Sequence, residues 1–160
     1  MNFNIGITGV PGTGKTTICR MLEERGYEIV DMNLFSMENG CTHGDDVDID
    51  CLNSIVKKNW GKILDSHYSH LLSCYAVIEM YCSPETLQER LDERGYERAK
   101  IEENMDCLMI DCIGSECIEN FPQNRILRLN SEQDDGTANL NKAVSFIEKM
   151  EAKHNGSGFL

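Results

Sequence analysis

The sequence predicts an α/β fold in which five mainly parallel strands form a sheet with helices on both faces, a three-layer sandwich. Short apolar segments alternate with segments of helical periodicity along the chain. A glycine-rich turn separates the first apolar segment from the first helical one. The length of 160 residues is that of one ordinary domain, so residues 1–160 are expected to share one core and one principal site.

The first fifty residues predict two strands with a helix between them, followed by a polar segment. Residues 3–8 alternate in character, and residues 15–25 carry apolar side chains at helical spacing. Gly26 ends that helix, and residues 27–31 predict a second strand. Residues 32–50 are polar and acidic, and we expect them to form an exposed, mobile segment.

The middle of the chain predicts a short amphipathic helix and two further strands. The helix is expected near residues 52–56, and a buried strand at residues 62–65 ends on a carboxylate. Residues 76–81 predict the fourth strand. Ser83 then stands as the N-cap of a helix over residues 84–94.

The last third of the chain predicts two helices with a strand between them. Residues 101–113 place apolar side chains at steps of three and four, which predicts one longer helix with a single apolar face. The fifth strand is expected at residues 125–129. The final helix carries Leu140, Val144 and Ile147, and a Gly-Ser tail follows it. Right-handed crossovers restrict the order of the parallel strands.

The charge balance disfavours direct binding to nucleic acid. The chain has 15 Lys and Arg against 27 Asp and Glu, a formal net charge of -12. Because nucleic-acid affinity depends on cations that pair with phosphates, a basic protein suits this surface better than RNA. The alternative is that acidity only improves solubility. No apolar segment approaches the roughly 20 residues of a membrane span. Because a glycine-rich motif already begins at Gly9, we expect no leader peptide.

The eight cysteines are scattered, with no CxxC pair. Cys107, Cys112 and Cys117 recur every five residues, a spacing that drifts around a helix and does not gather metal ligands on one face. We therefore expect free thiols in the core, as in a reducing cytosol, and no zinc site.

Residues 9–16 (GVPGTGKT) match the pattern G-x-x-x-x-G-K-[ST] in full, between a predicted strand and a predicted helix. The glycines let backbone N–H groups turn toward phosphate oxygens, and the helix directs its positive end at the same charge. Lys15 is expected to bridge the outer phosphates of ATP, and the Thr16 hydroxyl to hold Mg²⁺. The alternative is a chance glycine-rich turn before a helix.

Two further candidates follow the third predicted strand. Ligands of an open parallel sheet bind beyond the carboxyl ends of its strands, so Asp65 is expected beside the phosphates, where it orients the Mg²⁺ shell. His67 can position or deprotonate a water molecule at neutral pH. The alternatives are that Asp65 caps the next turn and that His67 is a surface residue. The neighbouring His70 has no comparable argument.

Four cations predict a lid. Arg90 and Arg94 lie four residues apart on one predicted helix, and Arg98 and Lys100 follow its end. Phosphoryl transfer needs cations that neutralise charge on the moving group. The alternative is a solvated face paired with neighbouring acidic residues.

Three segments carry a resemblance to a known family: GVPGTGKTT, LDSHYSH and ERLDERGYERAKIEEN, in this order. They resemble the small adenylate kinase-like ATPases of archaea and the eukaryotic nucleus, over most of the chain. The resemblance implies a P-loop NTPase fold of the nucleoside monophosphate (NMP) kinase type. An NMP-binding segment is then expected at about residues 32–52, and a lid at about residues 93–104.

The resemblance also implies an activity and a partner. The activity is phosphoryl transfer between ATP and AMP, with a separate ATPase activity and Mg²⁺ as cofactor. The partner is ribosomal protein uS11, met during late maturation of the small ribosomal subunit, in the archaeal cytoplasm or the eukaryotic nucleus. Carried over position by position, the ATP-binding residues are Gly12, Gly14, Lys15, Thr16 and Thr17. Asp65 and His67 become a Walker B-like pair, and Arg94 becomes the lid contact with ATP.

The sequence departs from the family pattern where the second nucleotide is expected. Residues 33–38 contain no arginine, although family members usually carry one there, and this segment is shortened. The fourth strand ends in Tyr81, where an arginine is often found. The acidic residues 45–50 repel a monophosphate unless they face away. The phosphate of a second nucleotide therefore lacks an obvious clamp.

Three functional hypotheses follow. The first is an adenylate kinase with ATPase activity that acts in small-subunit maturation. The second is a nucleotide-gated binding module for a basic ribosomal protein, with ATPase but little kinase activity. The third is a kinase of the same fold that acts on a small metabolite.

Overall fold

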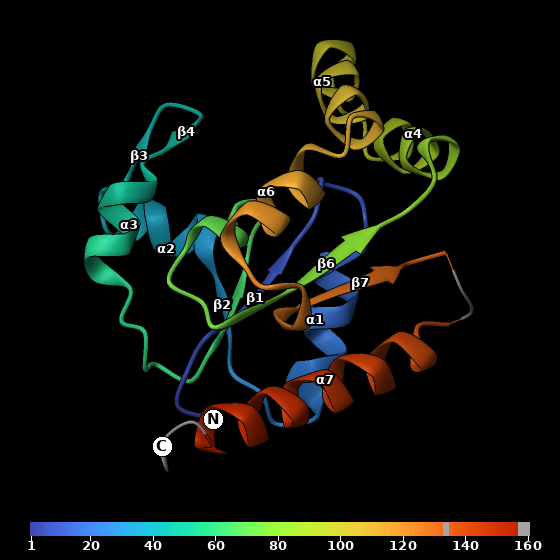
Figure 1. Ribbon diagram of the computed structural model, residues 1–160. Helices are drawn as coiled ribbons and strands as arrows, with labels where there is room; N and C mark the ends of the chain where they lie inside the picture. The colour runs from blue at the N-terminus through green and yellow to red at the C-terminus, as the bar shows by residue number, and fades with distance from the viewer. Residues whose placement is uncertain (133–134, 157–160) are drawn as a thin grey trace.

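A computed structural model of the chain describes residues 1–132 and 135–156. Its centre is a sheet of five parallel strands in the order β2-β5-β1-β6-β7 (Figure 1). The strands are β1 (Ile5–Thr8), β2 (Ile29–Asp31), β5 (Ile63–Asp65), β6 (Ala76–Tyr81) and β7 (Ile126–Asn130). The predicted fold class is confirmed.

Helices cover both faces of this sheet, and a small separate unit stands beside its β2 edge (Figure 1). One face carries α1 (Lys15–Glu24) and α7 (Thr137–Gly156). The other carries α4 (Pro84–Glu93), α5 (Arg98–Met109) and α6 (Cys112–Asn120). The edge unit comprises α2 (Met32–Glu38), the hairpin β3 (Thr42–His43) and β4 (Asp46–Val47), and α3 (Ile49–Ile55). Two short 3-10 helices, η1 (Ser69–Leu71) and η2 (Gln123–Arg125), precede β6 and β7.

The central strands are apolar on both faces because helices cover both. Ile78 of β6 packs against the α1 and α7 face, whereas its neighbour Val77 packs against α4 to α6. Residues 76–80 are all buried, which is the pattern of an interior parallel strand. Within the described residues, no helix is both long and apolar enough to cross a membrane.

The expected single helix over residues 101–113 is wrong, because the chain forms two helices there. α5 ends at Met109, and α6 begins at Cys112 after a turn at Ile110 and Asp111. Asp111 has a φ of 53°, which breaks helical geometry. Apolar spacing alone did not signal the break, because the apolar residues of both helices pack into one core cluster.

Most of residues 32–50 are exposed, as expected, but they form α2, the β3–β4 hairpin and the start of α3, and their mobility stays a prediction. Asp31 caps α2, since its Oδ1 accepts hydrogen bonds from the backbone N–H groups of Asn33 and Leu34 at 3.0 and 3.2 Å. Met32 and Cys41 are fully buried and pack against α3 and β5. A few apolar side chains thus fix a segment that is otherwise polar.

The expectation of eight free thiols is also wrong. Cys41 is bonded to Cys51, and Cys107 to Cys112, with Cα atoms 5.5 and 5.3 Å apart. The five-residue spacing of the second pair gathers no ligands on a continuous helix, but it spans the turn between α5 and α6. The remaining cysteines are free, as predicted: Cys19, Cys74, Cys82 and Cys117.

Smaller differences concern the ends of elements. The second strand is shorter than predicted and begins at Ile29, and the fifth is shifted by one residue to Ile126–Asn130. Ser83 caps α4 as expected, because its hydroxyl accepts a hydrogen bond from the N–H of Thr86 at 3.2 Å. The final helix extends to Gly156, and the rest of the predicted Gly-Ser tail lies outside the described residues.

Candidate active site

The glycine-rich loop leaves the carboxyl end of the central strand β1 and returns as α1. Gly12 and Gly14 have φ values of 93° and 101°, which are strained for any residue with a side chain. Thr13 is fully buried and braces the turn, since its hydroxyl donates a 2.6 Å hydrogen bond to the carbonyl of Val10. The loop is therefore held in its curved form by its own residues.

Lys15 lies inside this curve. Its ammonium group donates hydrogen bonds to the loop carbonyls of Gly9 at 2.7 Å and Val10 at 3.2 Å. Burial lowers the pKa of Lys15 to about 8, against the opposing attraction of Asp65. The Lys15 ammonium group is desolvated and contacts neutral carbonyl groups, so a phosphate that approaches it would stabilise its charge. A phosphate-binding site requires such a cation.

The first turn of α1 presents backbone N–H groups to the same space. No described side chain caps this end of the helix. Thr16 and Thr17 are exposed in this turn, beside Lys15. A helix end that combines free N–H groups with exposed hydroxyls binds anions through hydrogen bonds and through its positive pole.

Two carboxylates end neighbouring strands beside the loop. Asp65 ends β5, and Asp31 ends β2 in direct register with it. Burial raises the pKa of Asp65, and the charge of Asp31 raises it further, while Lys15 and the hydrogen-bonded Cys19 thiol oppose the rise. The structure therefore brings Asp65 next to Lys15, as expected from its place at the end of a strand. Asp31 was not among the predicted site residues, although it also ends a strand.

His67 follows Asp65 on the loop between β5 and η1, and its side chain is only partly exposed. Partial burial lowers the pKa of His67, and the nearby cations Lys15 and Lys100 lower it further. The imidazole is therefore neutral at pH 7 and able to accept a proton. Its proximity to Lys15 agrees with the predicted role, which itself stays a prediction.

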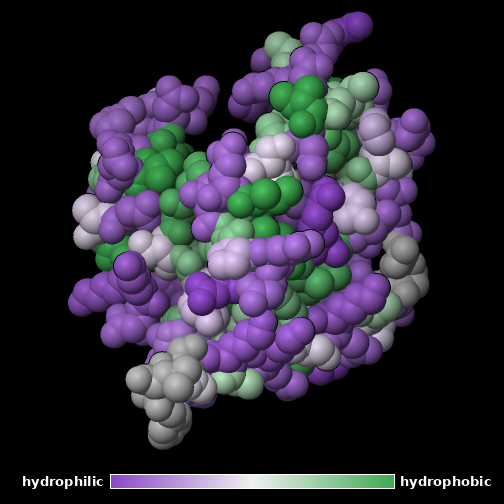
Figure 2. Space-filling model, viewed as in Figure 1, coloured by the Kyte–Doolittle hydropathy of each residue, from purple (hydrophilic) through white to green (hydrophobic). Residues whose placement is uncertain are grey.

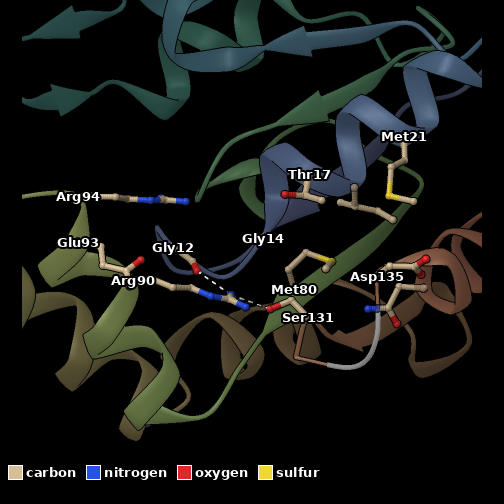
Figure 3. Close-up of a pocket in the computed structure, with 13 residues that line it drawn as sticks. Gly12, Gly14, Thr17, Met21, Met80, Arg90, Glu93, Arg94, Ser131 and Asp135 are labelled. Carbon is tan, nitrogen blue, oxygen red and sulfur yellow. Dashed lines mark hydrogen bonds between the residues drawn. The ribbon is translucent and has the colours of Figure 1, made fainter.

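A cavity of about 580 Å³ opens beside the loop, between α4 and the segment that leads into α7 (Figure 3). Arg90 reaches across it and donates hydrogen bonds to the carbonyl of Gly12 at 3.0 Å and to the hydroxyl of Ser131 at 2.9 Å. Arg94, at the end of α4, also lines the cavity (Figure 3). The other lining residues are Gly14, Thr17, Ile18, Met21, Met80, Glu93, Asp135, Gly136 and Asn139.

The predicted lid cluster divides into two parts. Arg90 and Arg94 face the cavity, as their four-residue spacing predicted. Arg98 instead pairs with Glu102 at 3.2 Å, with both side chains exposed. Lys100 pairs with Glu103 at 3.8 Å. The second pair of cations thus has the solvated, ion-paired character of the alternative reading.

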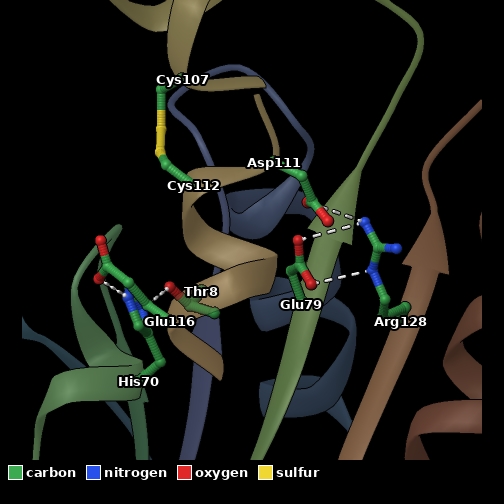
Figure 4. Close-up of a disulfide and its surroundings, with 8 residues drawn as sticks. All are labelled: Thr8, His70, Glu79, Cys107, Asp111, Cys112, Glu116 and Arg128. Carbon is green, nitrogen blue, oxygen red and sulfur yellow. Dashed lines mark hydrogen bonds and ion pairs between the residues drawn. A yellow bond between two sulfur atoms is a disulfide. The ribbon is translucent and has the colours of Figure 1, made fainter. Parts of the chain in front are cut away.

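A buried hydrogen-bond chain joins the start of the loop to α6 (Figure 4). Thr8, the last residue of β1, lies 2.7 Å from Nδ1 of His70, and Nε2 of His70 lies 2.7 Å from the Glu116 carboxylate. Burial lowers the pKa of His70, although Glu116 opposes this. No role for His70 could be predicted from the sequence, because its partner Glu116 lies 46 residues away.

A second network ties α6 to the sheet on the far side of the same helix (Figure 4). Arg128 of β7 donates to the buried Glu79 at 2.9 Å and to Asp111 at 3.3 Å. Its guanidinium carbon also lies 4.8 Å from the centre of the Tyr81 ring. A cation therefore does stand beside Tyr81, but two carboxylates neutralise it.

The donors present fit a magnesium ion held mainly by substrate. The described residues contain no cluster of three or more His, Cys, Asp or Glu side chains suited to a metal. Thr16 and Asp65 supply a hydroxyl and a carboxylate, the hard oxygen donors that Mg²⁺ prefers. Because Mg²⁺ usually completes its shell with water and phosphate oxygens, these two side chains are a sufficient protein contribution.

Together, the phosphate loop, the inward lysine and the parallel sheet define a P-loop nucleotide-binding protein. Residues 5–111 match the family model described as an AAA domain. The chain is similar to the "Putative adenylate kinase" of Thermoplasma acidophilum, with 40% identity over 95% of this chain and 99% of that protein. It is 42% identical to the protein of the same name from Pyrococcus abyssi, over 72% of this chain and 68% of that one.

The chain belongs to this adenylate kinase-like family. The predicted resemblance is confirmed to that extent. Among solved structures, shikimate kinase from Acinetobacter baumannii superposes with a TM-score of 0.66 at 17% identity, over 93% of this chain and 94% of that chain. At this low identity the likeness bears on the fold alone, and it agrees with a P-loop kinase architecture.

Proposed function

We propose that this chain transfers the terminal phosphoryl group of ATP to a nucleoside monophosphate, with AMP as the first candidate. The observation that carries the proposal is the position of Lys15 inside the phosphate loop. A cavity large enough for a nucleotide opens beside that loop and is lined by its residues Gly12 and Gly14. Family membership supports a nucleotide kinase.

The residues of the proposed site have three roles: phosphate binding, charge neutralisation and magnesium binding. The loop N–H groups and Lys15 bind the phosphates, and Arg90 and Arg94 lie where they can neutralise charge on the outer groups. Thr16 and Asp65 would hold Mg²⁺, which bridges phosphate oxygens and screens their charge when bound. The acceptor oxygen then attacks the terminal phosphorus in line with the leaving ADP oxygen.

ATP hydrolysis is the second activity in this proposal. His67 is neutral at pH 7 because its pKa is lowered, so it can accept a hydrogen bond from water and take its proton. Both activities use the same bound ATP, and they differ only in whether a monophosphate or a water molecule occupies the acceptor position.

The acceptor side carries few cations. Residues 32–52 contain no Lys or Arg, and Arg128 beside Tyr81 is paired with two carboxylates. A monophosphate therefore depends on Arg94, which lines the cavity, for its charge partner. This favours weak binding of AMP, and it makes hydrolysis a substantial competitor of transfer.

A product assay tests the proposal. ATP and Mg²⁺ are incubated with the protein, with and without AMP, and ADP and phosphate are separated by chromatography. We expect ADP to form faster with AMP and in excess over the released phosphate, and Lys15→Ala to abolish both reactions. If AMP does not change the release of phosphate, the chain is an ATPase and not an AMP kinase. ADP formed only with an alcohol acceptor would identify a small-metabolite kinase.

A second candidate function is a nucleotide-gated binding module for a basic protein such as ribosomal protein uS11, in small-subunit maturation. Met109, Ile110 and Ile118 are 69–74% exposed, and Figure 2 shows apolar side chains gathered over α6 and the end of α5. The net charge of -12 favours a basic partner. Co-precipitation of purified uS11 that weakens with salt and changes with ATP supports this function, and binding that ignores both argues against it.

A further inference from the structure

A second cavity, of about 260 Å³, opens at the amino ends of the strands, opposite the phosphate loop. Phe3 precedes β1, Tyr75 precedes β6 and Arg125 precedes β7. The carboxyl end of α7, with His154, closes the same region near the N-terminus (Figure 1). The length of the sheet therefore separates this cavity from the candidate active site.

The lining of this cavity is basic, in contrast to the rest of the molecule. Among the residues that the structure describes, the lining includes Lys58, Arg125 and His154 and no carboxylate, although acidic residues outnumber Lys and Arg by 27 to 15 in the chain. Within residues 1–132 and 135–156, neither Lys58 nor Arg125 forms an ion pair or donates a side-chain hydrogen bond. Two cations without protein acceptors thus face one small cavity.

Aromatic rings set the orientation of Arg125. Its guanidinium carbon lies 3.9 Å from the centre of the Tyr75 ring. The Tyr75 ring in turn packs against Phe3 and His154, with centroids 4.9 and 5.0 Å apart. Stacking fixes the plane of a guanidinium and leaves its N–H groups available at the edge, which suits a carboxylate or phosphate.

One buried side chain fixes the walls of the cavity. Asn4 is fully buried and donates hydrogen bonds to the carbonyls of Lys57 at 2.9 Å and Ser73 at 3.0 Å. Its Oδ1 accepts a hydrogen bond from the N–H of Lys62 at 3.3 Å. The segments that carry Lys58 and Ser73 are therefore held to the start of β1, so little reorganisation is needed for a ligand to bind.

We infer that this cavity is a second ligand site, for a small oxyanion joined to a flat apolar group of about one ring. Lys58 and Arg125 bind the phosphate or carboxylate oxygens. The Tyr75 and His154 rings bind the flat part. The site stands on its own residues, and it does not depend on the nucleotide chemistry proposed above.

The test is a titration of the full chain, followed residue by residue in ¹H–¹⁵N NMR spectra. A non-hydrolysable ATP analogue with Mg²⁺ is present throughout, so that the phosphate loop is occupied. The probes are phenyl phosphate and benzoate, which distinguish the two oxyanions, and benzyl alcohol as the neutral control. We expect saturable shifts at Tyr75, Arg125 and His154 with at least one anion and none with the alcohol.

Variants decide whether the cations are responsible. Arg125→Gln and Lys58→Gln should each weaken binding of the anion by about tenfold or more, the loss expected for one charge-assisted hydrogen bond. Lys142→Gln, at the far end of α7, is the matched control and should bind normally. Shifts confined to the phosphate loop, or equal affinity in Lys58→Gln, Arg125→Gln and the native chain, would overturn the inference. Native-like spectra of each variant exclude a failure to fold.

Discussion

A single guanidinium, that of Arg90, joins the three segments that surround the candidate nucleotide cavity. It comes from α4, and it contacts the phosphate loop at Gly12 and the segment after β7 at Ser131. The helical spacing of Arg90 and Arg94 was visible in the sequence. The contact with Ser131 was not, because the two residues are 41 positions apart.

We predict that Arg90→Lys loses as much affinity for an ATP analogue as Arg90→Ala does. Arg90 contacts two partners with one planar group, whereas an ammonium group cannot match that geometry. Both variants should bind an ATP analogue about tenfold more weakly, as judged by calorimetry. Arg98→Ala is the control, since Arg98 lies on the exposed face of α5, and its affinity should be unchanged. Native affinity in Arg90→Lys would show that charge alone suffices.

His70 predicts a pH dependence of stability. Its pKa is lowered in the folded state, so the unfolded chain binds the proton more readily. The free energy of unfolding should therefore be highest above about pH 6.5, the unperturbed value, and should fall as the pH drops below it. His70→Gln should lose part of this slope and also cost about 1–3 kcal/mol at pH 7.5, because Thr8 and Glu116 lose their shared partner.

Urea unfolding at pH 5.5 and pH 7.5 measures this effect. The exposed His43 provides the matched control, and His43→Gln should keep the slope of the native chain. An identical slope in His70→Gln would show that folding does not lower the pKa of His70. His67, whose pKa is also lowered, contributes to the slope that remains.

At the scale of elements, sequence patterns predicted the sheet well and the connections poorly. Strands such as β6 follow from their own apolar composition and from the Ser83 cap that begins the next helix. The break between α5 and α6 depends instead on Asp111, whose left-handed backbone is stabilised by contacts with the distant Arg128. The apolar spacing within one segment does not show which distant residue, such as Arg128, will contact it.

The corner at Asp111 reverses a general rule about glycine. Gly→Ala within a helix usually stabilises it by about 1 kcal/mol. At Gly114 of α6, however, a Cβ atom would collide with the Asp111 carboxylate. We predict that Gly114→Ala destabilises the chain by up to about 1 kcal/mol, because the half-exposed Asp111 carboxylate must move and give up its ion pair with Arg128.

A double-mutant cycle tests that explanation. In an Asp111→Gly background the collision is absent, so Gly114→Ala should be neutral or stabilising by up to about 1 kcal/mol. Denaturant unfolding of the native chain, the two single variants and the double variant gives the coupling free energy between positions 111 and 114. If Gly114→Ala changes the free energy of unfolding equally in both backgrounds, a collision with Asp111 does not cause the destabilisation.

The disulfide between Cys41 and Cys51 closes the edge unit around the β3–β4 hairpin. Its loss in Cys41→Ala/Cys51→Ala should lower the free energy of unfolding by about 2–3 kcal/mol, the loss expected for a loop of this length. The Cys107→Ala/Cys112→Ala chain, with a shorter loop, should lose less. Thiol titration of the unfolded, unreduced native chain should find four of the eight cysteines reactive. Eight reactive thiols would contradict both bonds.

At the scale of the whole molecule, two covering units flank the carboxyl end of the sheet. The edge unit of α2 to α3 stands on one side, and α4 with α5 on the other (Figure 1). The alternation of strands and helices predicted this sheet and the position of the loop at its centre. It did not predict the basic cavity at the opposite end, because Lys58, Arg125 and His154 lie far apart in the sequence.

The central claim is that the loop at the end of β1 binds a nucleoside triphosphate through Lys15. Calorimetric titration of a non-hydrolysable ATP analogue with Mg²⁺ into the native chain and Lys15→Ala tests it directly. We predict one saturable site in the native chain and a loss of affinity of at least about 100-fold in the variant. No measurable binding by the native chain, or equal binding by the two, would contradict the claim.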